Sequence, residues 1–168
     1  MANKPKDIGT RQETNICNVI NDFAGDKVAL RIAQKGKYDN GDIRISVGDL
    51  LITGESKHCK KAPSEGQLAE FKRQTVDENA NAGQDGGVLF VNVPNCSIQR
   101  MQCHMQLKTL LRIRGADRAI EREDIPEEAK ERLRRALMAD DEHSWICVTM
   151  WSFLNICWGR PAWEYIRD

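Results

Sequence analysis

The sequence predicts an α/β protein with a mixed central β-sheet flanked by helices, folded as a single domain over residues 1–168. Helix-like and strand-like patterns alternate along the chain, as expected when both share one core. The run at 87–93 is apolar throughout, which is typical of a central strand covered on both faces. A chain of 168 residues is long enough to bury a sizeable core.

The composition favours a soluble protein of a reducing compartment. The chain is 40% hydrophobic and 30% charged, and no apolar run reaches the roughly eighteen residues that cross a membrane. Residues 1–15 lack the apolar segment of a secretory signal. The six cysteines show no Cys-x-x-Cys spacing, so free thiols and a cytoplasmic location are expected.

The first half of the chain is predicted as one helix followed by three strands. After a polar segment, the helix runs from Gly9 or Thr10 to about Phe23, because its apolar residues follow the i, i+3, i+4, i+7 spacing of one buried face. The elements expected next are a strand over 27–32, a polar loop over 34–40, and a strand pair over 41–57 that turns near Gly48.

The second half begins with a helix capped at Ser64. Ser64 and Gln67 have the spacing of a capping box, and Phe71 and Thr75 mark the packed side of the helix. Glycines from Gly83 onward end it. The elements expected after that are a strand over 87–93, helices over 97–114 and 124–139, a strand over 145–150, and a closing helix over 151–158.

Three charged residues of the strand pair are predicted to share one site. Residues i and i+2 of a strand face the same side, so Glu55 and Lys57 point together whereas Ser56 points away. If the two arms pair, Asp42 closes on Glu55. Two carboxylates beside an ammonium suit Mg²⁺, which takes one or two protein carboxylates, several waters and substrate phosphate oxygens. Asp49 is the alternative acid, but it lies too close to Glu55 in sequence for a turn and a return strand.

The order Asp42, twelve residues, then Glu55-x-Lys57 resembles the core motif of the PD-(D/E)xK nuclease superfamily. The helix start Gly-Thr-Arg-Gln-Glu over 9–13 and the Gln-bearing helix and strand over 64–93 extend the resemblance. Together they resemble the Holliday-junction-resolvase branch and the small resolvase-like endonucleases carried by phages. The implied restriction-endonuclease-like core covers about 9–95 and 143–158, with a helical insertion over about 97–142 before the last strand.

The resemblance implies a metal-dependent DNA endonuclease, most directly a homodimeric Holliday junction or branched-DNA resolvase. Its cofactor would be Mg²⁺, with Mn²⁺ as a substitute, and a phage-encoded chain would work in the host cytoplasm. Asp42, Glu55 and Glu13 would bind the metal. Lys57 would orient or help deprotonate the attacking water, and Gln74 would lie near that water or the phosphate. The alternatives are a solvent-exposed first-turn acid for Glu13 and an ordinary surface side chain for Gln74.

The net charge is zero, but the charge is unevenly placed. Residues 57–114 hold nine basic and five acidic side chains, whereas 115–142 hold six basic and ten acidic. Phosphate contact requires a local basic patch rather than a basic chain. The basic residues expected to contact DNA are Arg11, Lys35, Lys37, Lys60, Lys61, Lys72 and Arg73.

Other functions stay open at this stage. One is a nuclease that acts on duplex ends or nicks, and another is a nuclease-fold protein that binds DNA or a virion partner without cutting. The joint presence of Asp42, Glu55 and Lys57 favours catalysis. The cysteines and histidines at 58, 59, 96, 103 and 104 fit no common zinc module. The tryptophans at 145, 151, 158 and 163 suit core packing, a dimer contact or base stacking.

Overall fold

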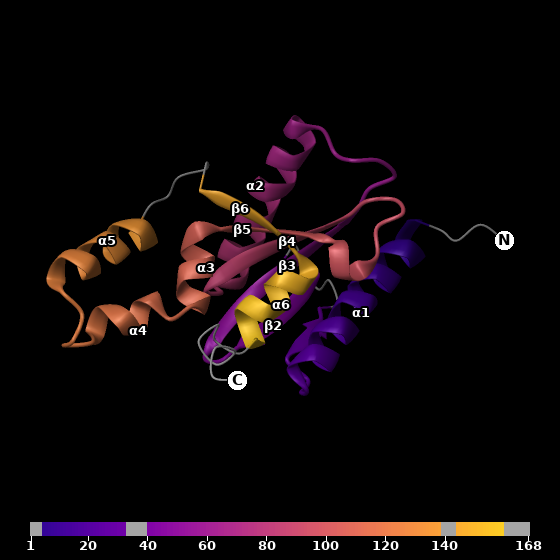
Figure 1. Ribbon diagram of the computed structural model, residues 1–168. Helices are drawn as coiled ribbons and strands as arrows, with labels where there is room; N and C mark the ends of the chain where they lie inside the picture. Colours follow the sequence, from indigo (N-terminus) through magenta and orange to yellow (C-terminus); the bar gives the residue numbers. More distant parts are fainter. Residues whose placement is uncertain (1–4, 33–39, 139–143, 160–168) are drawn as a thin grey trace.

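The computed structural model describes residues 5–32, 40–138 and 144–159 (Figure 1). Six strands in these ranges form one sheet in the order of the sequence. The β3–β4 pair is parallel and the other neighbouring pairs are antiparallel, so the predicted mixed sheet of an α/β fold is confirmed. The strands are β1 (Ala29–Arg31), β2 (Ile43–Val47), β3 (Leu50–His58), β4 (Gly86–Asn92), β5 (Gln102–Gln106) and β6 (Trp145–Thr149).

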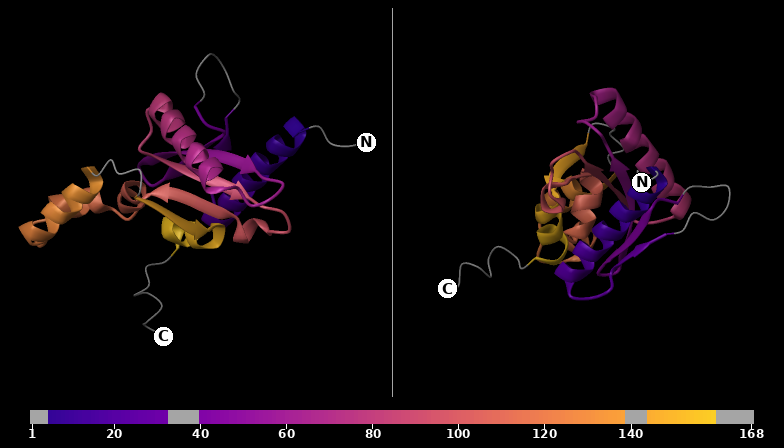
Figure 2. Two further views of the ribbon diagram at one scale, coloured as in Figure 1. Left: turned by 90° about the horizontal axis from the view of Figure 1, so that it is seen from above. Right: turned by 90° about the vertical axis from the view of Figure 1, so that its right-hand side faces the viewer.

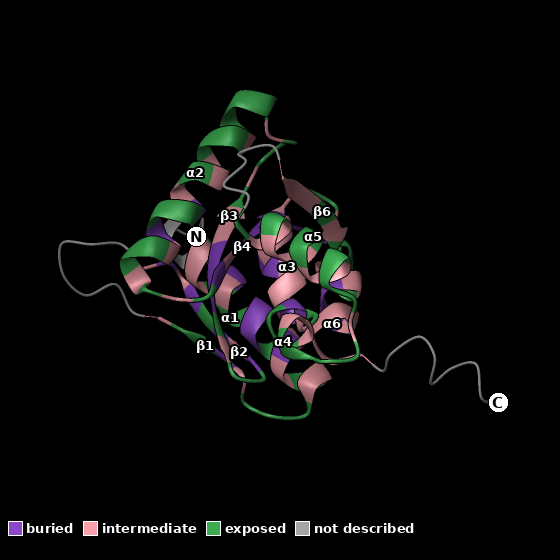
Figure 3. Ribbon diagram, turned by 90° about the vertical axis from the view of Figure 1, so that its left-hand side faces the viewer, coloured by how far each residue is buried: buried purple, intermediate pink, exposed green. Residues whose placement is uncertain are grey.

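Helices cover both faces of the sheet (Figure 2). α1 (Pro5–Ala24) and α6 (Met150–Trp158) pack on one face, where Ile16, Ile52 and Phe153 belong to the core. α2 (Glu65–Ala82) lies on the other face, against β3 and β4. Figure 3 shows buried residues in the strands and on the inward sides of these helices. The remaining helices are η1 (Ile98–Arg100), α3 (Leu107–Ile113), α4 (Ala116–Glu121) and α5 (Glu127–Met138).

α2 begins as predicted and packs tightly on the sheet. The Ser64 side chain accepts a hydrogen bond from Gln67 N, and the Gln67 side chain accepts one from Ser64 N, which completes the predicted capping box. Gly83 ends the helix with a left-handed φ of 61°. A Cβ on Gly87 of β4 would lie 3.0 Å from Thr75 Cγ2. The missing side chain of Gly87 therefore sets how closely α2 approaches the sheet.

The single helix predicted over 97–114 is wrong, because this segment forms η1, β5 and α3. Methionine and glutamine favour helices, but Cys103 and Met105 point into the core while β5 pairs with β4. Tertiary pairing therefore outweighs local propensity. The predicted insertion over 97–142 contains a core strand, and its helical part begins at Leu107.

Two other bounds differ from the prediction. α1 begins at Pro5 instead of Gly9 or Thr10, since proline is tolerated in the first turn of a helix. α4 was not predicted, and Gly115, with φ of 80°, separates it from α3. α4 and α5 lie to one side of the sheet, at the left of Figure 1. No helix in the described ranges is long and apolar enough to cross a membrane. All six cysteines are free thiols, as predicted.

Candidate active site

The β2–β3 hairpin places Asp42 beside Glu55. Ile43 pairs with Gly54, so Asp42 lies one residue beyond the last β2–β3 pair and opposite Glu55. Beyond Gly54, β4 is the one strand that pairs with β3 among the residues the structure describes. The Ser56 N–H on the open side of β3 donates instead to Asp42 Oδ2 across 3.0 Å. This bond fixes the Asp42 carboxylate along the unpaired half of β3.

Glu55 and Lys57 share the face of β3 that α2 covers, as predicted. Lys57 Nζ forms an ion pair with Glu55 Oε1, and Glu55 is only 5% exposed. The same ammonium lies 5.5 Å from the ring centre of Phe71 on α2, a cation–π distance. Ser56 points to the other face, where Gln12 donates to its Oγ. The structure thus brings Asp42, Glu55 and Lys57 together in one cluster.

Negative charge in this cluster perturbs both Asp42 and Lys57. Burial raises the pKa of Asp42 to about 7, and the charges of Glu55 and Glu13 add to the rise. Burial alone would lower the pKa of Lys57, but Glu55, Glu78 and Asp42 together raise it above its ordinary value. Lys57 is therefore protonated at neutral pH, which suits an electrostatic role better than that of a general base.

Glu13 is paired with a basic residue and does not complete a cluster of three carboxylates. It accepts a hydrogen bond from Arg31 Nε at 2.6 Å, and its side chain is 15% exposed. It faces inward as predicted, but it lies in the middle of α1 instead of at its N-terminal end, because α1 begins at Pro5. Its charge acts on Asp42. The geometry does not place it as a metal ligand beside Asp42 and Glu55, because Arg31 holds its carboxylate.

Glu78 of α2 adds a buried carboxylate that sequence reasoning missed. It is 7% exposed and contributes to the raised pKa of Lys57. A Cβ on Gly41, the residue before Asp42, would lie 3.8 Å from Glu78 Oε2, so this carboxylate packs beside the hairpin. The sequence signal that could have indicated its burial is its spacing, because Glu78 follows Thr75 by three residues and lies on the same inward face of α2.

Gln74 and Arg73 are engaged on α2 itself. Gln74 Nε2 donates to Glu70 Oε1 at 2.9 Å, while Arg73 donates to Glu70 and to Asp77, each at 2.7 Å. Hydrogen bonds from Arg73 and Gln74 lower the pKa of Glu70, and Lys57 contributes a smaller share. The contact of Gln74 is thus with Glu70 on its own helix, and Arg73 is largely neutralised by Glu70 and Asp77.

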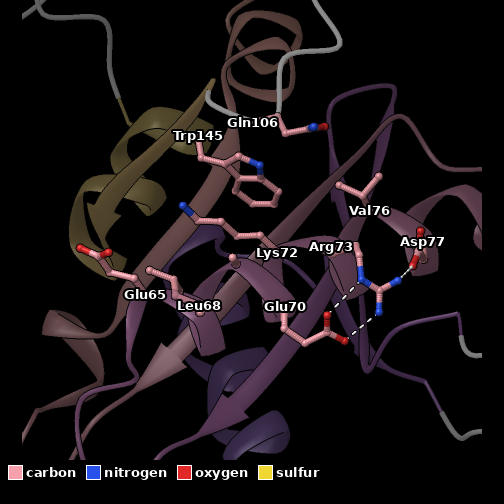
Figure 4. Close-up of a pocket in the computed structure, with 11 residues that line it drawn as sticks. Glu65, Leu68, Glu70, Lys72, Arg73, Val76, Asp77, Gln106 and Trp145 are labelled. Carbon is pink, nitrogen blue, oxygen red and sulfur yellow. Dashed lines mark hydrogen bonds and ion pairs between the residues drawn. The ribbon is translucent and has the colours of Figure 1, made fainter.

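Lys72 lies over a different part of the sheet. Figure 4 shows it reaching toward Trp145 of β6, with Nζ 5.4 Å from the centre of the indole ring system. Leu68 and Val76 help to line the groove of about 800 Å³ between α2 and Trp145. β3 and β6 are three strand spacings apart, roughly 14 Å. The predicted DNA contact at Lys72 is thus not adjacent to Asp42.

The other predicted DNA contacts differ in how far the structure describes them. Arg11, Lys60 and Lys61 have exposed side chains. Lys35 and Lys37 lie outside the described residues, as do most of the predicted loop over 34–40 and Trp163. Trp158 packs edge-on against a phenylalanine of α6, 6.3 Å between ring centres, in agreement with core packing.

Asp42 and Glu55 fit a magnesium ion by their chemistry. Within the described ranges, no three histidine, cysteine, aspartate or glutamate side chains gather as a metal-binding group. Mg²⁺ needs only one or two carboxylates because waters and substrate phosphates supply its other ligands. Burial is the main reason that the pKa of Asp42 is raised, and the nearby charge of Glu55 adds to it, so a bound cation would stabilise the ionised form of Asp42.

Fold and site together define an α/β protein whose mixed sheet carries two carboxylates and a protonated lysine around one half-paired strand. No protein-family model matches the chain, and no curated protein matches it in sequence. Among solved structures it is similar to Hjc, a Holliday junction resolvase of Archaeoglobus fulgidus, with a TM-score of 0.41 and 19% identity. The match covers 56% of this chain and 74% of that chain. Similarity of this size defines no family, so the function must be inferred from the cluster itself.

Proposed function

We propose that this protein is a metal-dependent DNA endonuclease that acts on four-way or branched DNA. The observation that carries the proposal is the cluster in which the half-buried Asp42 and the buried Glu55 share a site with the protonated Lys57. Phosphodiester hydrolysis requires a positioned water and positive charge near the phosphate. The motif formed by these three residues resembles that of PD-(D/E)xK nucleases, which supports the same chemistry.

Each residue of the cluster has a distinct role in this proposal. Asp42 and Glu55 would hold Mg²⁺, or Mn²⁺ in its place, and the bound ion lowers the pKa of a water ligand and offsets charge on the phosphate. Lys57 donates hydrogen bonds to the phosphate or the attacking water. Ser56 keeps the Asp42 carboxylate in place through its N–H. Glu13 is held in an ion pair with Arg31 and would contribute negative charge near the site without binding the metal.

The choice of substrate rests on the sequence resemblance, and the basic side chains near the end of β3 agree with it. Lys60 and Lys61 lie just after β3 and are exposed, as is Arg11 in the second turn of α1. A four-way junction is two-fold symmetric, so paired cuts on opposing strands require two active sites and hence a homodimer. Free thiols agree with work in the cytoplasm.

The test is cleavage of labelled DNA by the purified protein with Mg²⁺ or Mn²⁺. The substrates are a four-way junction, a linear duplex and a single strand of matched sequence. Glu55→Ala and Lys57→Ala are compared with Glu123→Ala and Lys27→Ala, which change exposed residues of the same types outside the cluster. We expect symmetric junction cuts that the first two variants lose and the two controls retain.

Other outcomes assign other functions. Equal cutting of the linear duplex would indicate a general nuclease that acts on ends or nicks. Binding of the junction without cutting in either metal would indicate a DNA-binding or virion-associated protein of this fold. Cutting that survives both Glu55→Ala and Lys57→Ala would show that the chemistry lies elsewhere in the molecule.

A further inference from the structure

Gln12 of α1 is buried against the back of the strand that carries the cluster. It is 6% exposed, although glutamine is usually a surface residue. Its Nε2 donates to Ser56 Oγ across 2.8 Å, and its Oε1 lies 2.9 Å from His58 Nδ1. An amide oxygen only accepts, so Nδ1 of His58 carries the hydrogen in this contact. One side chain thus holds two alternate residues of β3.

The part of β3 that Gln12 holds lies beyond its pairing with β2 and, within the described ranges, has one strand neighbour, β4. The β2–β3 pairing ends at Gly54, and the residues that follow it pair with β4. Glu55 and Lys57 alternate with Ser56 and His58 on this half-paired segment, so fixing one pair of residues orients the other. The Ser56 N–H is also the donor that aims Asp42.

We propose that Gln12 is a positioning residue, which fixes Glu55, Lys57 and Asp42 in their active arrangement by hydrogen bonding to Ser56 and His58 behind the strand. The inference rests on the proposed nuclease function of the cluster. It extends that function to a residue on α1 that touches none of the three reacting groups. The segment 9–13, which lies inside α1, would thus contribute through Gln12 as well as through Glu13.

The test compares Gln12→Met, which keeps the length of the side chain but forms no strong hydrogen bond, with Gln12→Glu. The glutamate still accepts from His58, and in place of the lost donor it can accept a hydrogen bond from the Ser56 hydroxyl. Gln99→Met, at an exposed position of η1, is the matched control. Three measurements are made on each full-length protein: single-turnover cleavage of the junction, Mn²⁺ affinity by electron paramagnetic resonance, and amide hydrogen exchange at Ser56.

We expect Gln12→Met to lose about tenfold in the cleavage rate or Mn²⁺ affinity, as changes behind metal ligands do. The KM for DNA should stay unchanged while exchange at Ser56 becomes faster. Gln12→Glu should recover part of the loss, and Gln99→Met should match the wild type. If Gln12→Met does not fold, Ser56→Ala removes the same hydrogen bond from the strand side and should reproduce the loss.

Faster exchange at Ser56 with unchanged Mn²⁺ affinity and cleavage would overturn the proposal, because Gln12 would then serve only the fold. Unchanged exchange would overturn it as well. A wild-type protein that binds Mn²⁺ but does not cut would reject the nuclease function alone, since the effect of Gln12→Met on Mn²⁺ affinity would still decide the positioning role. A wild type that neither cuts nor binds Mn²⁺ would reject both.

Discussion

Arg31 Nε donates a hydrogen bond to Glu13 Oε2 across 2.6 Å, and this pair links β1 to α1 beside the candidate active site. The guanidinium offsets part of the negative charge that Glu13 adds near Asp42. Arg31→Gln keeps a donor for Glu13 but removes the positive charge. We expect Mn²⁺ to bind about twofold to tenfold more tightly to this variant at low ionic strength.

The measurement is a Mn²⁺ titration followed by electron paramagnetic resonance. Arg118→Gln, at an exposed site on α4, controls for the loss of one charge from the whole protein. Weaker binding in Arg31→Gln would show that the pair maintains the shape of the site and that its charge is secondary.

Asp42 gives the metal-free protein a pH-dependent stability. Its pKa in the folded state is about 7, above the ordinary 3.8, so the folded state holds the proton more tightly than the unfolded state. The free energy of unfolding should therefore fall as the pH rises from 3.8 toward 7. Asp42→Asn should flatten this slope and raise Tm at pH 8 by about 2–4 °C for each 1 kcal/mol regained.

Thermal unfolding at a series of pH values, with EDTA present, measures this effect. Asp49→Asn, at the exposed turn of the same hairpin, is the control and should keep the slope of the wild type. Mg²⁺ at pH 8 should stabilise the wild type and leave Asp42→Asn nearly unaffected. An Asp42→Asn variant with the full slope would assign the titration to another group.

Lys57 should act through its positive charge. Lys57→Met is expected to lower the single-turnover cleavage rate by about 100-fold or more, the loss typical of a missing donor to a developing anion. Lys57→Arg should retain an intermediate rate, because it keeps the charge in a different geometry. Glu78→Gln should lower the pKa of Lys57, which the ¹³Cε shift of the lysine reports.

A general-base role makes a different prediction for the same variants. The rate of the wild type would then rise with pH along a limb that Lys57→Arg abolishes. A shared pH profile in the two proteins supports the electrostatic role.

Gly87 should control the packing of α2 on the sheet. A Cβ there meets Thr75 Cγ2 at 3.0 Å and Thr75 O at 3.3 Å, so Gly87→Ala should lower the free energy of unfolding by about 1–3 kcal/mol. Gly66→Ala is the matched control because a Cβ at Gly66, near the start of α2, has no neighbour within 4 Å. It should be neutral or stabilise by up to about 1 kcal/mol. Urea denaturation of both variants measures the difference, and an unaffected Gly87→Ala would show that α2 can shift outward freely.

Sequence patterns predicted the parts of the fold whose signal is local. The turn at Gly48, the capping box at Ser64 and the apolar run of β4 are short-range features, and each stands where it was expected. The i, i+2 rule likewise put Glu55 and Lys57 on one face of β3. The functional roles of these residues remain predictions.

The failures concern contacts between distant segments. β5 was taken for helix because its pairing with β4 is invisible in a local window, while methionine and glutamine suit a helix. The partner of Glu13 is Arg31, eighteen residues away, and sequence spacing gives no means of choosing it. The sequence does not reveal Glu78, because an acidic residue of a helix is normally exposed and only the fold places the β2–β3 hairpin beside it.

The charged residues of the cluster come from a continuous portion of the chain that ends within α2, and β4 supports β3 from the far side mainly through its backbone. β5, β6 and the helices between them supply the sheet edge and the second half of the core. The rate of amino-acid substitution should therefore differ between the two parts of this protein. Relatives are expected to keep Gln12, Asp42, Glu55, Lys57 and Glu78 and to vary more in the α4–α5 region, which lies to one side of the sheet (Figure 1).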